Sequence, residues 1–141
     1  MDKITVKRDI WIDASRDRVW QAVTNPQQIG KWWPPDEWDI PRLQVGASVT
    51  FGKDNGAKAT IAVVDPPREF TLQWQPNEKF PTAFMFTSLV LVEENGGTRL
   101  QITEGGFETL PEEIRQTRAA QSGEGYVLVL GNLKALLEKN S

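Results

Sequence analysis

The alternation of apolar and polar residues from about residue 43 to residue 104 restricts the fold of this chain more than any other feature. A period of two residues is typical of β-strands with one buried face. Turn sequences such as Asp65-Pro66-Pro67 and Asn95-Gly96-Gly97 divide this segment into short strands, and Asn55-Gly56 is a strong hairpin signal. Because successive strands joined by short turns pair as hairpins, we expect an antiparallel sheet.

A further strand and two short helices are predicted before this segment. Residues 4–13 alternate well enough to form the first strand, and Ser15 is a suitable N-cap for the helix that follows. Asn25-Pro26 ends that helix and begins a second one. Trp32 and Trp33 follow Ile29 at spacings of three and four residues, so the second helix turns one apolar face inward.

The last part of the chain has a helical pattern. Pro111, followed by two acids, suits the start of a helix, whereas Gly123 and Gly125 should weaken or kink its middle. The apolar stripe of this helix consists of Tyr126, Val129, Leu130, Leu133, Leu136 and Leu137. A twisted sheet of about six strands cannot bury its concave face against itself, so the long helix should cover it. We therefore predict an α+β helix-grip fold, with residues 1–141 forming a single domain.

The composition argues against nucleic acid and against a membrane as partners. The 141 residues include 16 basic and 19 acidic side chains, a formal net charge of -3, without any local run of Lys or Arg. A nucleic-acid-binding protein usually carries a basic patch, so no nucleic acid is expected as a partner. No stretch approaches the roughly 20 apolar residues of a membrane span, and the N-terminus lacks an apolar signal region. We expect no membrane insertion and a cytoplasmic location.

The chain contains neither cysteine nor histidine. Their absence excludes thiolate catalysis, Ser-His-Asp triads and metal sites built from Cys or His. Asp36, Glu37 and Asp39 form an acidic cluster, but a short loop does not guarantee the convergence that an oxygen-only metal site needs. We predict no metal, no cofactor and no catalytic residue.

Several short motifs resemble the START-like, or SRPBCC, superfamily. Ile12-Asp13-Ala14-Ser15, followed by Arg18-Val19-Trp20-Gln21-Ala22, resembles its opening, and Ile29-Gly30-Lys31-Trp32-Trp33 resembles its Leu-x-x-Trp-Trp signature. Three later motifs resemble those of one branch of this superfamily: Gly97-Thr98-Arg99-Leu100, Gly106-Phe107 and Gly125-Tyr126. That branch is the family named after the C-terminal domain of the activator of the heat-shock protein 90 ATPase. The resemblance spans nearly the whole chain. It implies an apolar cavity between sheet and helix that binds lipids, polyketides or other apolar molecules.

Ten residues are candidates for contact with a ligand in such a cavity. They are Arg8, Trp33, Trp38, Phe51, Trp74, Phe86, Glu104, Phe107, Tyr126 and Leu130. Arg8 and Glu104 each share a strand face with apolar residues, and a charge on a core face is costly unless it is paired. These two residues therefore either pair with each other or orient the polar end of a ligand. Tyr126 either bonds a ligand with its hydroxyl or fills the place where the family usually has Trp.

The position of each tryptophan in the apolar pattern predicts whether it lies in the core, at the cavity or on the surface. Trp20 and Trp32 lie on apolar helix stripes and should be core residues. Trp33 and Trp38 flank the Pro34-Pro35 segment and either contact the ligand or pack. Trp11 has the opposite parity to its apolar neighbours, so it should point outward and mark a partner surface.

Three functions are compatible with these features. The first is a protein that binds or carries a small apolar molecule, lipid-like or polyketide-like, without catalytic machinery. The second is an enzyme of the polyketide cyclase or dehydratase type, whose acid or base would come from Glu104, Tyr126 or Arg8. The third is a chaperone-associated module that would bind through Trp11 and the loop around Trp38. Monomer and homodimer are both compatible with the sequence.

Overall fold

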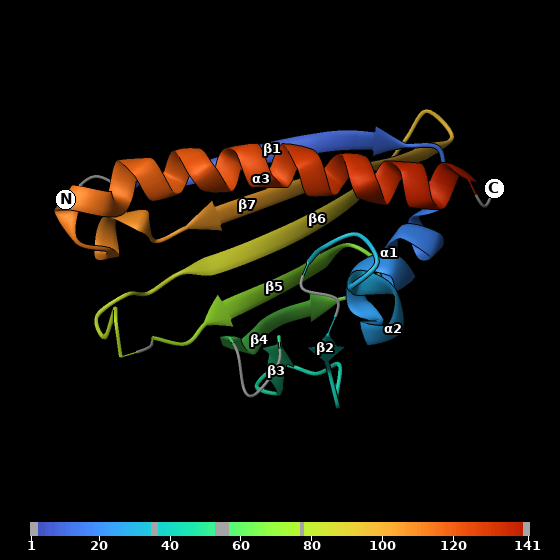
Figure 1. Cartoon of the computed structure of the whole chain (residues 1–141). Helices are drawn as coiled ribbons and strands as arrows, with labels where there is room; N and C mark the ends of the chain where they lie inside the picture. Colours follow the sequence, from blue (N-terminus) through green and yellow to red (C-terminus); the bar gives the residue numbers. More distant parts are fainter. Residues whose placement is uncertain (1–2, 35–36, 53–56, 77, 140–141) are drawn as a thin grey trace.

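The computed structural model of the chain describes residues 3–34, 37–52, 57–76 and 78–139. Seven antiparallel strands form one sheet in the order β1-β7-β6-β5-β4-β3-β2 (Figure 1). The strands are β1 Thr5–Ile12, β2 Trp38–Asp39, β3 Ser48–Phe51, β4 Ala57–Asp65, β5 Glu69–Trp74, β6 Phe86–Glu94 and β7 Gly97–Gly105. The helices are α1 Arg16–Thr24, α2 Pro26–Ile29, the 3-10 helix η1 Phe107–Thr109 and α3 Glu112–Lys139. The predicted α+β class, with two short helices and one long C-terminal helix, is confirmed.

Local sequence explains how the sheet is joined and bent. Asn95 and Gly96 both have positive φ angles, 50° and 79°, as a tight hairpin turn between β6 and β7 requires. In β4 the register with β5 shifts between Ile61 and Val63. Such a bulge bends a strand and increases its twist, which helps the sheet to curve. The predicted hairpin at Asn55-Gly56 lies outside the described residues.

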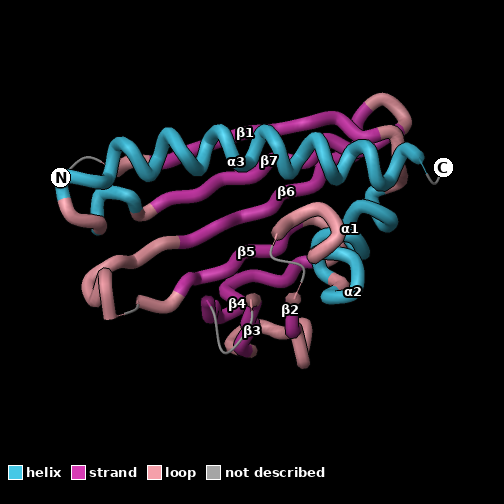
Figure 2. Tube along the Cα trace, in the orientation of Figure 1, coloured by secondary structure: helices cyan, strands magenta, loops and turns pink. Residues whose placement is uncertain are grey.

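Helix α3 covers one half of the sheet. It runs along β1 and β7, whereas β3, β4 and β5 lie away from it (Figure 1). Helices α1 and α2 lie at the end of the sheet where α3 ends, and the loop before β6 lies at the opposite end (Figure 2). None of the described helices is long and apolar enough to cross a membrane.

Gly123 and Gly125, which were predicted to weaken or kink α3, do not interrupt it, since the helix is continuous from Glu112 to Lys139. Gly123 is buried where the helix meets β1, and a Cβ atom there would collide with the guanidinium group of Arg8. This glycine therefore allows the close approach of helix and strand. Gly125 faces open space, with no atom within 4 Å of an added Cβ.

The core lies between α3, the concave face of the sheet, and α1 with α2. Trp20 and Trp32 are buried, with exposed fractions of 6% and 0%, so their prediction as core residues is confirmed. The second helix is shorter than predicted because α2 ends at Ile29. Backbone hydrogen bonds from Trp32 and Trp33 back to Ile29 nevertheless keep the chain in tight turns, so Trp32 still points inward.

Candidate functional site

A pocket of about 1270 Å³ opens between α3 and the part of the sheet that α3 does not cover. Its apolar lining includes the rings of Trp33, Phe51, Trp74, Phe80, Phe107 and Tyr126. Exposed residues such as Lys58, Gln75 and Leu128 stand at its mouth. Ligand pockets commonly measure about 300–1,000 Å³ and are mostly apolar with a few polar groups. This pocket is therefore large enough for a molecule of several fused rings.

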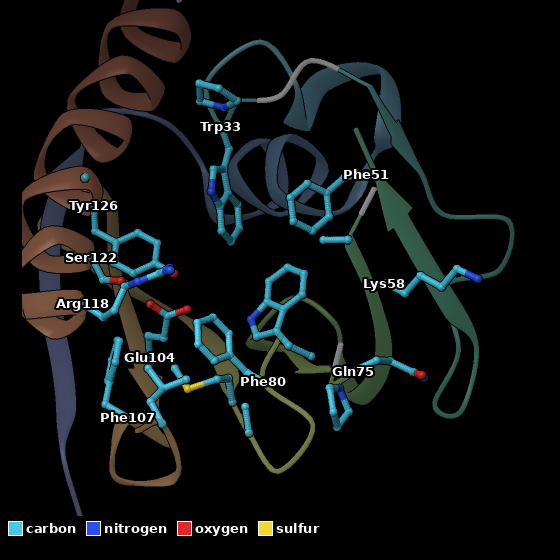
Figure 3. A pocket seen from close by; sticks show the side chains of 18 of the residues that line it. Trp33, Phe51, Lys58, Gln75, Phe80, Glu104, Phe107, Arg118, Ser122 and Tyr126 are labelled. Carbon is cyan, nitrogen blue, oxygen red and sulfur yellow. The ribbon is translucent and has the colours of Figure 1, made fainter. Parts of the chain in front are cut away.

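The pocket lies between separate elements of the fold (Figure 3). Glu104, Ser122, Arg118 and Tyr126 lie on one side, toward α3, whereas Phe51 lies on the opposite side. Phe80 comes from the loop between β5 and β6, and Trp33 from the turn after α2. Because these segments are far apart in the sequence, the folded chain brings the lining together.

Aromatic contacts fix the walls of the pocket. The rings of Trp33 and Tyr126 meet edge to face, with centroids 6.0 Å apart and planes at 74°. Phe51 and Trp74 make a similar contact at 5.1 Å and 67°. Edge-to-face pairs at these distances are favourable because the positive ring edge meets the negative ring face. Within each pair the two rings therefore hold each other in place and present apolar surface to the pocket.

Trp38 supports these walls from behind. It is 8% exposed and stacks on Phe51, with ring centroids 4.6 Å apart and planes at 13°. Its ring centroid is 5.1 Å from that of Trp33, and its Nε1–H group donates to the Trp33 carbonyl oxygen at 3.0 Å. Trp38 lies outside the lining of the pocket, so packing rather than direct contact describes its place.

Four polar residues, Thr87, Glu104, Ser122 and Tyr126, form a polar cluster on the side of the pocket near α3. Thr87 and Glu104 are partners in the register of β6 and β7, and Ser122 and Tyr126 are one helical turn apart on α3. The Thr87 hydroxyl accepts a hydrogen bond from Trp74 Nε1–H at 2.8 Å and lies 3.4 Å from Glu104 Oε2. It also lies 3.5 Å from the Tyr126 hydroxyl.

Burial changes the acidity of this cluster. Desolvation raises the pKa of Glu104, because the charged carboxylate loses contact with water. Hydrogen bonds from the neighbouring hydroxyl groups oppose part of that increase, in the order Ser122, Tyr126 and Thr87. Burial, followed by the charge of Glu104, raises the pKa of Tyr126 well above its usual range. The cluster thus favours neutral groups, and the Tyr126 hydroxyl stays a hydrogen-bond donor.

Six of the ten candidate residues line the pocket: Trp33, Phe51, Trp74, Glu104, Phe107 and Tyr126. Besides Trp38, three candidates lie elsewhere. Leu130 is 2% exposed and belongs to the core beneath α3. The ring of Phe86 packs over Gly105, where an added Cβ would lie 2.5 Å away, because the alternation of β6 turns Thr87 rather than Phe86 inward.

The expected pairing of Arg8 with Glu104 is not formed in the structure. Arg8 is exposed, packs against Gly123 and donates to the Lys7 carbonyl oxygen at 2.7 Å. Glu104 lies opposite Val6 rather than Arg8 in the register of β1 and β7. Its hydrogen-bond partners are the hydroxyl groups of the polar cluster. A strand face shared with apolar residues therefore predicted the inward position of Glu104 but not its partners.

Sequence reasoning missed several lining or cluster residues. Thr87 has the same inward parity as Leu89 and Leu91 in β6, and Ser122 lies four residues before Tyr126 on α3. Those two spacings could have identified them. Phe80 and Met85 come from a loop without periodicity, so no pattern signalled them. Asp36 of the acidic cluster lies outside the described residues, and no group of acidic side chains within them could hold a metal ion.

The two residues expected at a partner surface are less accessible than predicted. Trp11 is half-buried: its Nε1–H group donates to the Glu94 carbonyl oxygen at 2.7 Å, and Lys134 Nζ lies 5.2 Å from its ring centroid. Trp38 is buried in the aromatic stack. Parity alone gave the outward direction of Trp11 but could not show that a lysine from α3 reaches over its ring.

Solved structures with this fold come from several sources, all at low sequence identity. Protein MLL2253 from Mesorhizobium loti has a TM-score of 0.83 at 19% identity, covering 98% of this chain and 99% of that one. The Aha1 dimer from Colwellia psychrerythraea has a TM-score of 0.75 at 20% identity, with 96% of each chain covered. DynU16, from the dynemicin biosynthetic locus, has a TM-score of 0.76 at 20% identity; the match covers 97% of this chain and 48% of DynU16. At such identities these similarities establish the fold alone.

The sequence itself carries a family signal. No curated protein sequence matches the chain. A family model, Activator of Hsp90 ATPase homolog 1-like protein, matches residues 13–138, which is most of the chain. The motifs around Trp20, Trp32 and Gly125 lie within this range. The chain therefore belongs to the family of Activator of Hsp90 ATPase homolog 1-like proteins, a branch of the START-like superfamily.

Proposed function

We propose that this protein binds a small apolar molecule in the pocket between α3 and the sheet. The observation that carries the proposal is a cavity of about 1270 Å³ whose walls include Trp33, Phe51 and Trp74. Apolar surface removed from water contributes about 25 cal/mol per Å², so a ligand burying roughly 200 Å² would gain about 5 kcal/mol before the cost of association. A flat molecule with two or more rings is the simplest occupant of these walls.

The family name suggests a second candidate function, association with a chaperone. The sequence offered Trp11 and the loop around Trp38 as contacts; Trp11 is half-buried and Trp38 is buried, whereas its loop neighbours Glu37 and Asp39 are exposed. The pocket and its aromatic lining support the binding of a small molecule. A homodimer, the state in which the Colwellia psychrerythraea protein was solved, stays a prediction for this chain.

Naphthalene is a suitable probe for the proposed function. We expect saturable binding in equilibrium dialysis, and about tenfold weaker binding to Trp74→Leu, which corresponds to about 1.4 kcal/mol. The Trp74 ring is part of the pocket wall, and its Nε1–H group donates a hydrogen bond to the Thr87 hydroxyl. Its replacement therefore changes both the apolar wall and the polar side of the pocket. Native mass spectrometry of freshly purified protein would show whether a natural ligand co-purifies.

Trp11→Leu is the matched control for this experiment. It makes the same substitution at a half-buried tryptophan outside the pocket lining, so naphthalene affinity should stay within about twofold of the wild-type value. Absence of saturable binding to the wild-type protein, or equal losses in the two variants, would contradict the proposed function.

A further inference from the structure

The Thr87 hydroxyl makes two long contacts within the polar cluster of Thr87, Glu104, Ser122 and Tyr126. Hydrogen bonds between oxygen atoms usually measure about 2.7–2.8 Å. The Thr87 hydroxyl lies 3.4 Å from Glu104 Oε2 and 3.5 Å from the Tyr126 hydroxyl, whereas its bond from Trp74 Nε1–H is a normal 2.8 Å. A carboxyl group offers about four lone-pair positions. The cluster therefore has capacity for one more hydrogen-bonding partner from the pocket.

The charges around the cluster favour a neutral partner. In the part of the chain that the structure describes, no ion pair includes Glu104. From α3 the groups facing it are Tyr126 and Ser122, both hydroxyls. Arg118 also lines the pocket, but its guanidinium carbon lies 5.4 Å from the centre of the Phe80 ring. A ligand carboxylate placed beside Glu104 would lie next to a second carboxyl group, and such a like-charged neighbour disfavours its ionised form.

The pKa of Glu104 also favours a neutral partner. Desolvation raises its pKa, which favours the neutral carboxyl group. A neutral carboxyl can donate one hydrogen bond and accept others. It can therefore bind either a hydroxyl group or a carbonyl oxygen.

We propose that Glu104, Ser122 and Tyr126, supported from behind by the buried Thr87, form a polar subsite that selects aromatic ligands bearing a neutral hydroxyl or carbonyl group over aromatic carboxylates. The inference rests on the proposed function, because it assigns the polar end of the same ligand. The ring of Phe51 lies on the side of the pocket opposite Glu104, so the apolar body of the ligand would lie between Phe51 and the cluster (Figure 3). Selection then comes from one hydrogen-bonding group rather than from size.

Three related probes test this selection at neutral pH: naphthalene, 2-naphthol and 2-naphthoate. We expect 2-naphthol to bind about tenfold more tightly than naphthalene, since one net hydrogen bond to the cluster supplies a difference of that order. Transfer from water into an apolar pocket would by itself favour naphthalene over 2-naphthol. Tighter binding of 2-naphthol would therefore indicate a hydrogen bond between its hydroxyl group and the cluster. 2-Naphthoate should bind at least about tenfold more weakly than 2-naphthol, because its charge would lie beside the carboxyl group of Glu104.

Two variants of Glu104 separate the subsite from the pocket. Glu104→Leu should bind naphthalene and 2-naphthol with nearly equal affinity, because it removes the group that bonds the ligand hydroxyl. Glu104→Gln should keep most of that preference, within about threefold, because a neutral amide also donates and accepts hydrogen bonds. If Glu104→Leu does not fold, Tyr126→Phe removes only one hydroxyl group and should reduce the preference by about threefold.

The outcomes of this experiment distinguish the two proposals. Failure of naphthalene to bind would contradict the proposed function itself. Normal naphthalene binding would leave the proposed function in place and overturn the subsite in any of three cases: equal affinities for naphthalene and 2-naphthol, tightest binding of 2-naphthoate, or a 2-naphthol preference that survives Glu104→Leu. Loss of the preference in Glu104→Gln as complete as in Glu104→Leu would also contradict a subsite that works through hydrogen bonds of residue 104.

Discussion

Trp32→Ala is expected to lower the free energy of unfolding by about 3–5 kcal/mol, the range for a large aromatic side chain removed from a core. Trp32 is 0% exposed and is among the largest fully buried side chains. Its Nε1–H group donates to the Ala22 carbonyl oxygen at 2.9 Å, so the substitution also leaves a buried acceptor without its donor. Denaturation with urea, followed by circular dichroism, measures the loss.

Trp33→Ala is the comparison for this prediction, because it changes the neighbouring tryptophan. Trp33 is half-buried and faces the pocket, so we expect a loss of only about 1 kcal/mol together with weaker naphthalene binding. Similar losses of stability in the two variants would show that Trp33 is packed in the core as fully as Trp32. They would contradict the assignment of Trp33 to the pocket wall.

Gly106→Ala should have a comparably large effect for a different reason. Gly106 has a φ angle of 96°, and an added Cβ would collide with the carbonyl oxygen of Phe84. The backbone cannot move away easily, because the Phe84 N–H group donates to Thr109 Oγ1 at 2.8 Å and so fastens the two segments together. We expect a loss of about 4 kcal/mol or more, which is exceptional for a single methyl group. Urea unfolding again provides the measurement.

Gly46→Ala separates backbone strain from collision. Gly46 has nearly the same φ angle, 90°, but no atom lies within 4 Å of an added Cβ. This variant should therefore cost only about 1–2 kcal/mol, the penalty for a left-handed backbone conformation. If both variants lost the same amount of stability, the packing of Phe84 over Gly106, and with it the placement of Phe107 at the pocket, would be wrong.

The regular parts of the fold could be predicted because they depend on periodicity. Alternation placed β1 at residues 4–13, close to the observed Thr5–Ile12, and the apolar stripe predicted α3. Two errors have physical causes. The strand β2 has two residues, too few for any alternation to be visible. The low helix propensity of Gly123 predicted a weak point, whereas α3 continues through this residue, which is buried against Arg8.

Residues of the candidate site could be predicted only where they belong to a regular strand or helix. Glu104 and Tyr126 were found because strand parity and helix spacing place them on inward faces, and both line the pocket. Phe86 was misplaced because the run Phe84-Met85-Phe86 gives no phase, and only its pairing with neighbouring strands shows that Thr87 points inward. Phe80 could not be found, since its position depends on a loop packed against distant elements.

The indole N–H signals of the six tryptophans test the central claim, that an apolar molecule occupies this pocket, most directly. In a titration of ¹⁵N-labelled protein with naphthalene, signals assigned by single Trp→Phe variants report on separate places in the fold. Trp33 and Trp74 line the pocket, whereas Trp32 is fully buried in the core and Trp11 packs beneath Lys134. We expect the Trp33 and Trp74 signals to shift together and to saturate at one concentration, while those of Trp11 and Trp32 stay in place. Unchanged signals for Trp33 and Trp74, or a shift confined to Trp11, would contradict the claim.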